Sequence, residues 1–133
     1  MLATKVEKKE NKFQKTLDYV AEYSGVRGAA VFDREGLVVC KTGDKEFKAE
    51  VYAPLALLIL QQASNVLGRL QEHPAQTLVI KTKNSWITIE RIESLVLIVK
   101  AGSDTDELLK VRIGQSIDMI KSNLKDNYSL IMR

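Results

Sequence analysis

The chain has 133 residues, a formal net charge of +3 and a single cysteine, Cys40. This length suits one domain, residues 1–133, with an ordinary hydrophobic core. A lone cysteine excludes an internal disulfide bond, which fits a reducing cytoplasm, and we expect Cys40 to be a small strand residue. The longest unbroken apolar run, 51–60, is about half of the roughly 20 residues that a membrane span needs. No signal peptide follows the N-terminal lysines, so we expect a cytoplasmic protein without membrane insertion.

The positive charge is concentrated at the N-terminus. Residues 1–15 hold five lysines against Glu7 and Glu10, an excess of three that equals the net charge of the whole chain. We interpret 1–12 as a basic arm on a domain core at about 8–127, most simply the solvated start of a helix, with nucleic-acid or acidic-lipid contact as the alternative. No aromatic residues interleave with these lysines, so we expect no nucleic-acid partner.

The first predicted element is an amphipathic helix over about 8–24, because Phe13, Leu17 and Val20 follow helical spacing. Gly25 ends this helix. Two apolar segments follow, 27–33 and 37–42, on either side of a polar quartet that ends in Gly36. This pattern predicts a β-hairpin.

The stretch 51–70, VYAPLALLILQQASNVLGRL, predicts a helix with more apolar surface than one sheet can cover. Pro54 suits its first turn. We expect one face to dock on the core through Tyr52, Leu55, Ala56, Ile59, Leu60, Ala63, Val66, Leu67 and Leu70. The opposite arc carries Val51, Leu57 and Leu58, and then only short or neutral groups, Gln61, Ser64, Asn65 and Gly68. A charge-poor outer face indicates a partner.

Three closely spaced strands are predicted next, at 76–82, 85–92 and 94–102, as a meander of tight hairpins. The segment 95–99 is apolar at every position, so we expect a central strand with both faces covered. Asp104 suits the N-cap of a last helix, whose inward stripe is Leu109, Ile113, Ile117, Ile120 and Leu124. The order is α-β-β-α-β-β-β-α, an α+β fold with a five-stranded, mainly antiparallel sheet sandwiched between helices.

The segment 19–39, YVAEYSGVRGAAVFDREGLVV, contains the pattern G-V-x-G-x-x-V-x-D-x-x-G. It resembles the opening of a Roadblock domain, the dynein light chain family, which has many bacterial and archaeal members. The element order and the apolar second helix are also similar, over about residues 8–127. The motif residues have structural interpretations of their own: Gly25 and Gly36 suit positive φ, Asp33 can bond its own turn, and Gly28 allows a helix to cross close to the strand.

The resemblance implies a Roadblock or profilin-like fold and a homodimer. In family members the second helices pack antiparallel and the third strands pair at their edges. Mapped onto this chain, the interface consists of Val51, Leu57, Leu58, Gln61, Asn65, Gly68, Leu78, Val79 and Ile80. Bacterial and archaeal members commonly bind small Ras-like GTPases; the mutual gliding protein B group activates GTP hydrolysis in its partner without supplying a catalytic residue, and others are scaffolds.

The sequence carries no catalytic constellation. The P-loop, G-x-S-x-G and H-E-x-x-H patterns are missing, and the one histidine, His73, lies beside a proline. We therefore expect no enzyme, cofactor or metal site. The first hypothesis is a homodimeric regulator or scaffold of a small Ras-like GTPase. The alternatives are a structural adaptor in a motor or multiprotein assembly, and a small-molecule sensor with a closed cavity. The pattern also predicts that Leu58→Asp disrupts dimers and Ile59→Asp disrupts folding.

Overall fold

The computed structural model describes the backbone of residues 2–131 and the side chains of 12–125. The predicted α+β element order is confirmed. The elements are α1 (Leu2–Ala21), β1 (Val26–Asp33), β2 (Val38–Gly43), α2 (Ala49–Arg69), β3 (Thr77–Lys81), β4 (Ser85–Ile92), β5 (Leu95–Gly102) and α3 (Leu109–Ile131).

The five strands form one antiparallel sheet in the order β2-β1-β5-β4-β3. As predicted from its unbroken apolar run, β5 is the central strand, and its residues pair with β1 on one side and β4 on the other. The strands β3, β4 and β5 make the expected meander. This order leaves β2 and β3 as the two edges of the sheet.

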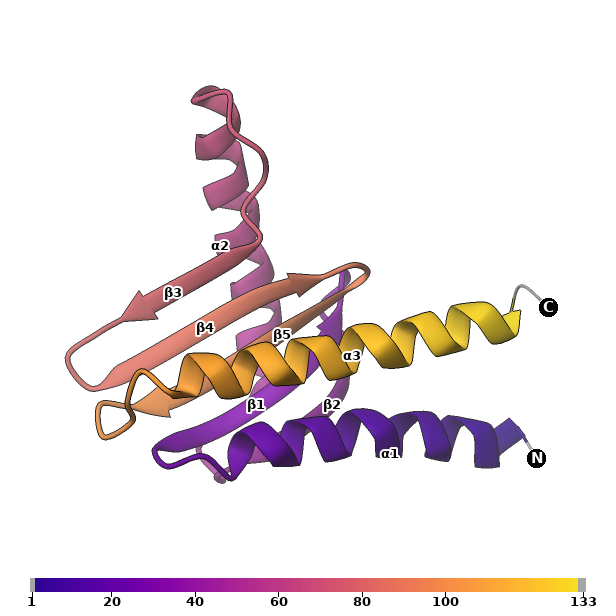
Figure 1. The fold of residues 1–133 in the computed structure, drawn as a ribbon. Coiled ribbons are helices and arrows are strands. Elements are labelled where there is room, and N and C mark those ends of the chain that lie inside the picture. The colour runs from indigo at the N-terminus through magenta and orange to yellow at the C-terminus, as the bar shows by residue number, and fades with distance from the viewer. Residues whose placement is uncertain (1, 132–133) are drawn as a thin grey trace.

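Helices cover both faces of the sheet. The helices α1 and α3 lie side by side on one face, and α2 crosses the other (Figure 1). Phe13 and Leu17 of α1 pack with Ile113 and Ile120 of α3 over the first face. A second buried cluster lies between α2 and the opposite face of the sheet. Both faces of the sheet are therefore buried from solvent at its centre.

The β1–β2 turn has the chemistry that its sequence predicts. Gly36 has a φ of 88° and Gly25, after α1, has a φ of 89°, a region that L-residues rarely adopt. One carboxylate oxygen of Asp33 accepts hydrogen bonds from the backbone N–H groups of Glu35 at 2.9 Å and Leu37 at 3.0 Å. Asp33 therefore has a structural role in the turn.

Both outer helices differ from their predicted bounds. The backbone is helical from Leu2 rather than from about residue 8, so residues 2–12 are the start of α1, as the helix-start interpretation of the basic N-terminus predicts. The helix α3 begins at Leu109, because Asp106 and not Asp104 accepts the exposed N–H group of Leu108, at 3.0 Å. Asp104 instead lies 3.3 Å from the guanidinium of Arg27.

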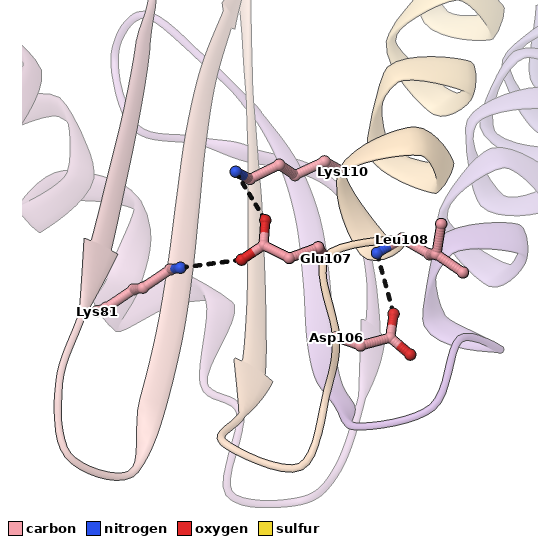
Figure 2. A network of polar contacts seen from close by, with 5 residues as sticks. All are labelled: Lys81, Asp106, Glu107, Leu108 and Lys110. Atoms are coloured by element: carbon pink, nitrogen blue, oxygen red, sulfur yellow. Dashed lines mark hydrogen bonds and ion pairs between the residues drawn. The ribbon is translucent and has the colours of Figure 1, made fainter.

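The start of α3 is tied to the edge strand β3 by an ion-pair network (Figure 2). Glu107 lies 2.9 Å from the ammonium of Lys110 and 3.3 Å from that of Lys81 on β3. The hydrogen bond from Lys110, followed by that from Lys81, holds the pKa of Glu107 below its usual value. Lys81 also lies over the ring of the buried Trp86, with Nζ 4.1 Å from the ring centroid. The only charge on β3 is therefore held against its own domain.

Gly28 allows a close contact, but its neighbour is not the one that we expected. The ring of Phe47, in the loop before α2, lies where a side chain at Gly28 would begin: an added Cβ would be 2.2 Å from that ring. The close approach to β1 is therefore made by an aromatic ring, not by a crossing helix.

We predict that Gly28→Ala lowers the free energy of unfolding by about 1–3 kcal/mol, because the Phe47 ring must move out of a packed site. Urea denaturation measures the change. Gly114→Ala is the matched control: it lies in α3 with no atom within 4 Å of an added Cβ, so helix propensity raises stability by about 1 kcal/mol. Equal effects of the two changes would contradict this packing.

We also predict that Lys110→Gln and Lys81→Gln each raise the pKa of Glu107 towards its usual value. Because the pKa is lowered in the folded state, the stabilisation is present at neutral pH and is lost as the pH falls through that lowered pKa. An NMR titration of the Glu107 carboxyl group measures the shift. Lys45→Gln, in the loop before α2, should leave this pKa unchanged.

Candidate protein–protein interface

Small residues set the contact between α2 and the sheet. Ala49, Ala53 and Ala56 are buried, followed along the same helical side by Leu60. Alanine side chains allow the helix axis to lie close to the strands. Tyr52 flanks this contact: its ring stacks on Phe47 with centroids 5.1 Å apart, and its hydroxyl accepts a hydrogen bond from Lys100 at 2.6 Å. The inner face of α2 is thus packed against its own domain.

The large aliphatic side chains of α2 lie mostly outward. Leu58 is 51% exposed and Ile59 is 41% exposed. The expected core face was rotated in error: four residues assigned to it are exposed, namely Leu55, Ile59, Val66 and Leu70. The predicted folding defect of Ile59→Asp is therefore wrong, and Leu60, 1% exposed, is the residue at which such a change would disrupt the core. The spacing Ala49, Ala53, Ala56 was the signal that could have identified the true inner face.

We name the outward residues Val51, Leu55, Leu58, Ile59 and Val66 the α2 apolar face. No charged residue lies between Glu50 and Arg69 on this helix. Glu50 itself is bonded to Lys41, with Nζ and Oε1 2.5 Å apart, and this hydrogen bond lowers the pKa of Glu50. The surface therefore has the charge depletion that marks the centres of protein interfaces.

By length and composition alone, α2 could also cross a membrane. Its apolar window has a mean hydropathy of 1.3, and 17% of that window is buried. The sequence analysis expected no membrane-spanning segment because it counted only unbroken apolar runs. An average over the whole helix also includes uncharged polar residues such as Gln61 and Ser64, and it is high enough for α2 to qualify. The inner face of α2 packs on the sheet of this domain. It is the outer face that lacks cover, and Figure 1 shows the C-terminal half of α2 extending past the strands.

A groove of about 480 Å³ runs along one flank of α2, against the turns of the sheet. Leu57, Gln61 and Asn65 line it from the helix, and Arg34 and Arg91 line it from the sheet side. Leu57 is half-buried and packs on the core cluster, so it is not part of the fully exposed face that we expected. Its position, about 40–100° around the helix from the three buried alanines, explains this dual role.

The strand β3 presents an open edge beside α2. It pairs with β4 only, and within residues 2–131 no other strand lies on its second edge. Leu78 and Ile80 are half-buried towards α2, whereas Val79 points to the other face and is 46% exposed. Ser64 of α2 accepts a hydrogen bond from the backbone of Ala75 at 3.1 Å, which anchors the loop that leads into this strand.

The structure separates the predicted interface residues into groups. Val51 and Leu58 lie on the α2 apolar face; Gln61 and Asn65 are exposed on the groove flank. Gly68 is exposed, with no atom within 4 Å of an added Cβ. Pro54 lies in the second helical turn and not in the first, because α2 already begins at Ala49. Sequence reasoning missed Leu55, Ile59 and Val66 as outward residues.

The described residues contain no cluster of three or more histidine, cysteine or acidic side chains that could hold a metal ion. Cys40 is buried on β2, as expected for a strand residue, and its thiol donates a hydrogen bond to Gln14 at 2.9 Å.

Residues 12–101 match the Roadblock/LC7 domain family. The fold is similar to MglB of Myxococcus xanthus, with a TM-score of 0.80, 14% identity, and 87% of this chain and 90% of that chain covered. An MglB with a tetrameric arrangement has a TM-score of 0.81 and 14% identity, with 89% of this chain and 91% of that chain covered. A Roadblock/LC7 domain of Streptomyces avermitilis has a TM-score of 0.75 and 16% identity, with 84% of this chain and 97% of that chain covered. No curated protein sequence matches. The chain belongs to the Roadblock/LC7 domain family.

Proposed function

We propose that this protein is a non-catalytic homodimer of the cytoplasm that binds a small Ras-like GTPase and regulates or scaffolds it. The observation that carries the proposal is the α2 apolar face, an uncharged exposed surface directly beside the open edge of β3. Nothing within the described residues covers either surface, whereas a second copy would cover both together.

The dimer follows from two-fold symmetry. When two identical β3 edges pair antiparallel, the two-fold axis stands perpendicular to the sheet, so both α2 helices lie on the same face of a continuous sheet. Val51, Leu55, Leu58 and Ile59 would then be covered by their counterparts. Self-association is also known for one protein of similar fold, an MglB with a tetrameric arrangement.

The GTPase partner is supported by the family. Roadblock proteins of bacteria and archaea commonly bind small Ras-like GTPases, and a dimer would offer a composite surface of paired α2 helices with one groove on each flank. Gln61, Asn65, Arg34 and Arg91 provide hydrogen-bond donors in that groove for a partner's polar side chains. A ligand-sensing role is less well supported, because core residues such as Phe32 and Leu97 are almost fully buried and the groove is open to solvent.

We predict that Leu58→Asp converts dimers to monomers. An unpaired charge in a desolvated seam costs about 3–5 kcal/mol, so the dimer dissociation constant should rise by more than about a hundredfold. Analytical ultracentrifugation measures it. Val111→Asp is the matched control: Val111 is an exposed apolar residue of α3, on the other face of the sheet, and its change should leave the mass unchanged.

Leu60→Asp separates folding from association. It places a charge in the core and should abolish cooperative unfolding, whereas Leu58→Asp should retain a native circular dichroism spectrum. A monomeric wild-type protein at micromolar concentration would contradict the dimer. An unchanged dimer in Leu58→Asp would show that another surface forms it.

The GTPase proposal predicts nucleotide-dependent binding. Ras-like GTPases encoded in the same genome are loaded with GDP or a non-hydrolysable GTP analogue and titrated against the wild-type protein and the Leu58→Asp variant. We expect tighter binding in one nucleotide state and loss of that binding in the variant. Faster GTP hydrolysis identifies an activator, and binding alone identifies a scaffold. An intact dimer that binds none of these GTPases would favour the structural adaptor.

A further inference from the structure

The outer side of the α1/α3 layer is a second exposed surface, and its chemistry differs from that of α2. Lys12 and Lys15 of α1 line a groove of about 440 Å³ between the two helices, opposite Met119 of α3. The backbone of α1 is helical from Leu2, so Lys5 and Lys8 occupy positions two helical turns before Lys12 and Lys15. The lysines thus recur along one side of a helix.

Apolar side chains also lie just before α3 and along it. Leu108, Val111 and Met119 are exposed, at 64%, 58% and 39%, and are spaced three and eight residues apart. Helical geometry places Gln115 and Ser122 on the same stripe, and Arg112 and Asp118 along its two borders. The helices α1 and α3 lie alongside each other (Figure 1), and the lysine row meets the apolar stripe at Met119, which lines one groove with Lys12 and Lys15.

Arg112 and Tyr19 lie at the contact between the two helices. The guanidinium of Arg112 lies 4.2 Å from the ring centroid of Tyr19 and donates a hydrogen bond to the Tyr19 carbonyl at 3.0 Å. Tyr19 bonds Gln115 across the helices. Cationic, aromatic and aliphatic groups are therefore displayed together, which is the composition of surfaces that lie in the headgroup region of a bilayer.

The lysines of this surface are available to a partner. Within the described side chains, 12–125, neither Lys12 nor Lys15 forms an ion pair. Asp118 is the one carboxylate that lines the groove. Two free ammonium groups, with more lysines along the same helix, complement an anionic partner.

We propose that the outer α1/α3 surface docks reversibly on bilayers that contain anionic phospholipid. Lys12 and Lys15 contact the headgroups, and Leu108, Val111 and Met119 enter the boundary of the acyl chains. A lipid surface accounts for the exposed aliphatic side chains, which a nucleic-acid phosphate backbone does not use. The helix α2 lies on the opposite face of the sheet and stays free for protein contacts.

This inference goes beyond the proposed function and is independent of it. If the protein also dimerises through α2 and β3, the perpendicular two-fold axis places both α1/α3 surfaces on the same side of the joined sheet. Two copies would then bind one membrane together, with a gain in avidity and no new contact.

The test is co-sedimentation of the full chain with phosphatidylcholine vesicles and with vesicles that also contain one third phosphatidylglycerol. We expect binding to the anionic vesicles only, weakened by added salt. Lys12→Gln/Lys15→Gln should weaken it about thirtyfold, since each lysine near an anionic surface contributes about fivefold. Asp118→Asn should strengthen it. Lys45→Gln/Lys48→Gln removes the same charge from the loop before α2 and should leave binding unchanged.

Three results would overturn the proposal: equal binding to neutral and anionic vesicles, equal losses in the two double variants, or binding to duplex DNA without binding to vesicles. The same lysine change is also made in the Leu58→Asp background. A further loss there supports lipid docking whether or not the chain dimerises, and no loss contradicts it. Circular dichroism confirms that each variant is folded.

Discussion

The packing of alanines against the sheet is the constraint on which the surface of this molecule depends. Ala49, Ala53 and Ala56 occupy the contact between α2 and the strands. A helix held this close has room for only one fully buried leucine on its inner side, Leu60, so Leu57 and Leu67 are only partly buried at its flanks and most of the other large aliphatic side chains are directed outward. Hydrophobic burial is thus completed inside the domain by small residues, while the larger apolar area of α2 is left for another molecule. The same geometry places that area beside the open edge of β3.

The sheet separates two surfaces with different chemistry. On one face, α2 presents aliphatic groups without a charge between Glu50 and Arg69. On the other, α1 and α3 bring lysines and a narrower apolar stripe together. Each surface is built on a long helix that packs on the sheet, whose central strand β5 is buried except at Lys100, so neither requires a flexible loop for its position. The ion pairs of Glu107 further tie β3 to α3 and keep Lys81 against its own domain rather than over the strand edge.

Features that depend on neighbouring residues in the sequence were predictable. The five strands, their hairpins, the central position of β5 and the turn chemistry of Asp33 and Gly36 follow from local alternation and local hydrogen bonding. The inward stripe of α3 was also predictable, because its opposite side is mostly polar.

The sequence by itself determined the order of elements, the excess of apolar residues on α2 and the absence of charge along that helix. Tertiary structure alone decided which apolar residues face outward. Because α2 is apolar around nearly its whole circumference, periodicity cannot orient it, and its rotation is set by the distance at which it meets the sheet. Tertiary structure also decided that Leu57 is half-buried and that the Phe47 ring lies over Gly28. Both are contacts between segments distant in the chain, and such contacts depend on how the folded surfaces fit together, which the spacing of residues in the sequence does not reveal.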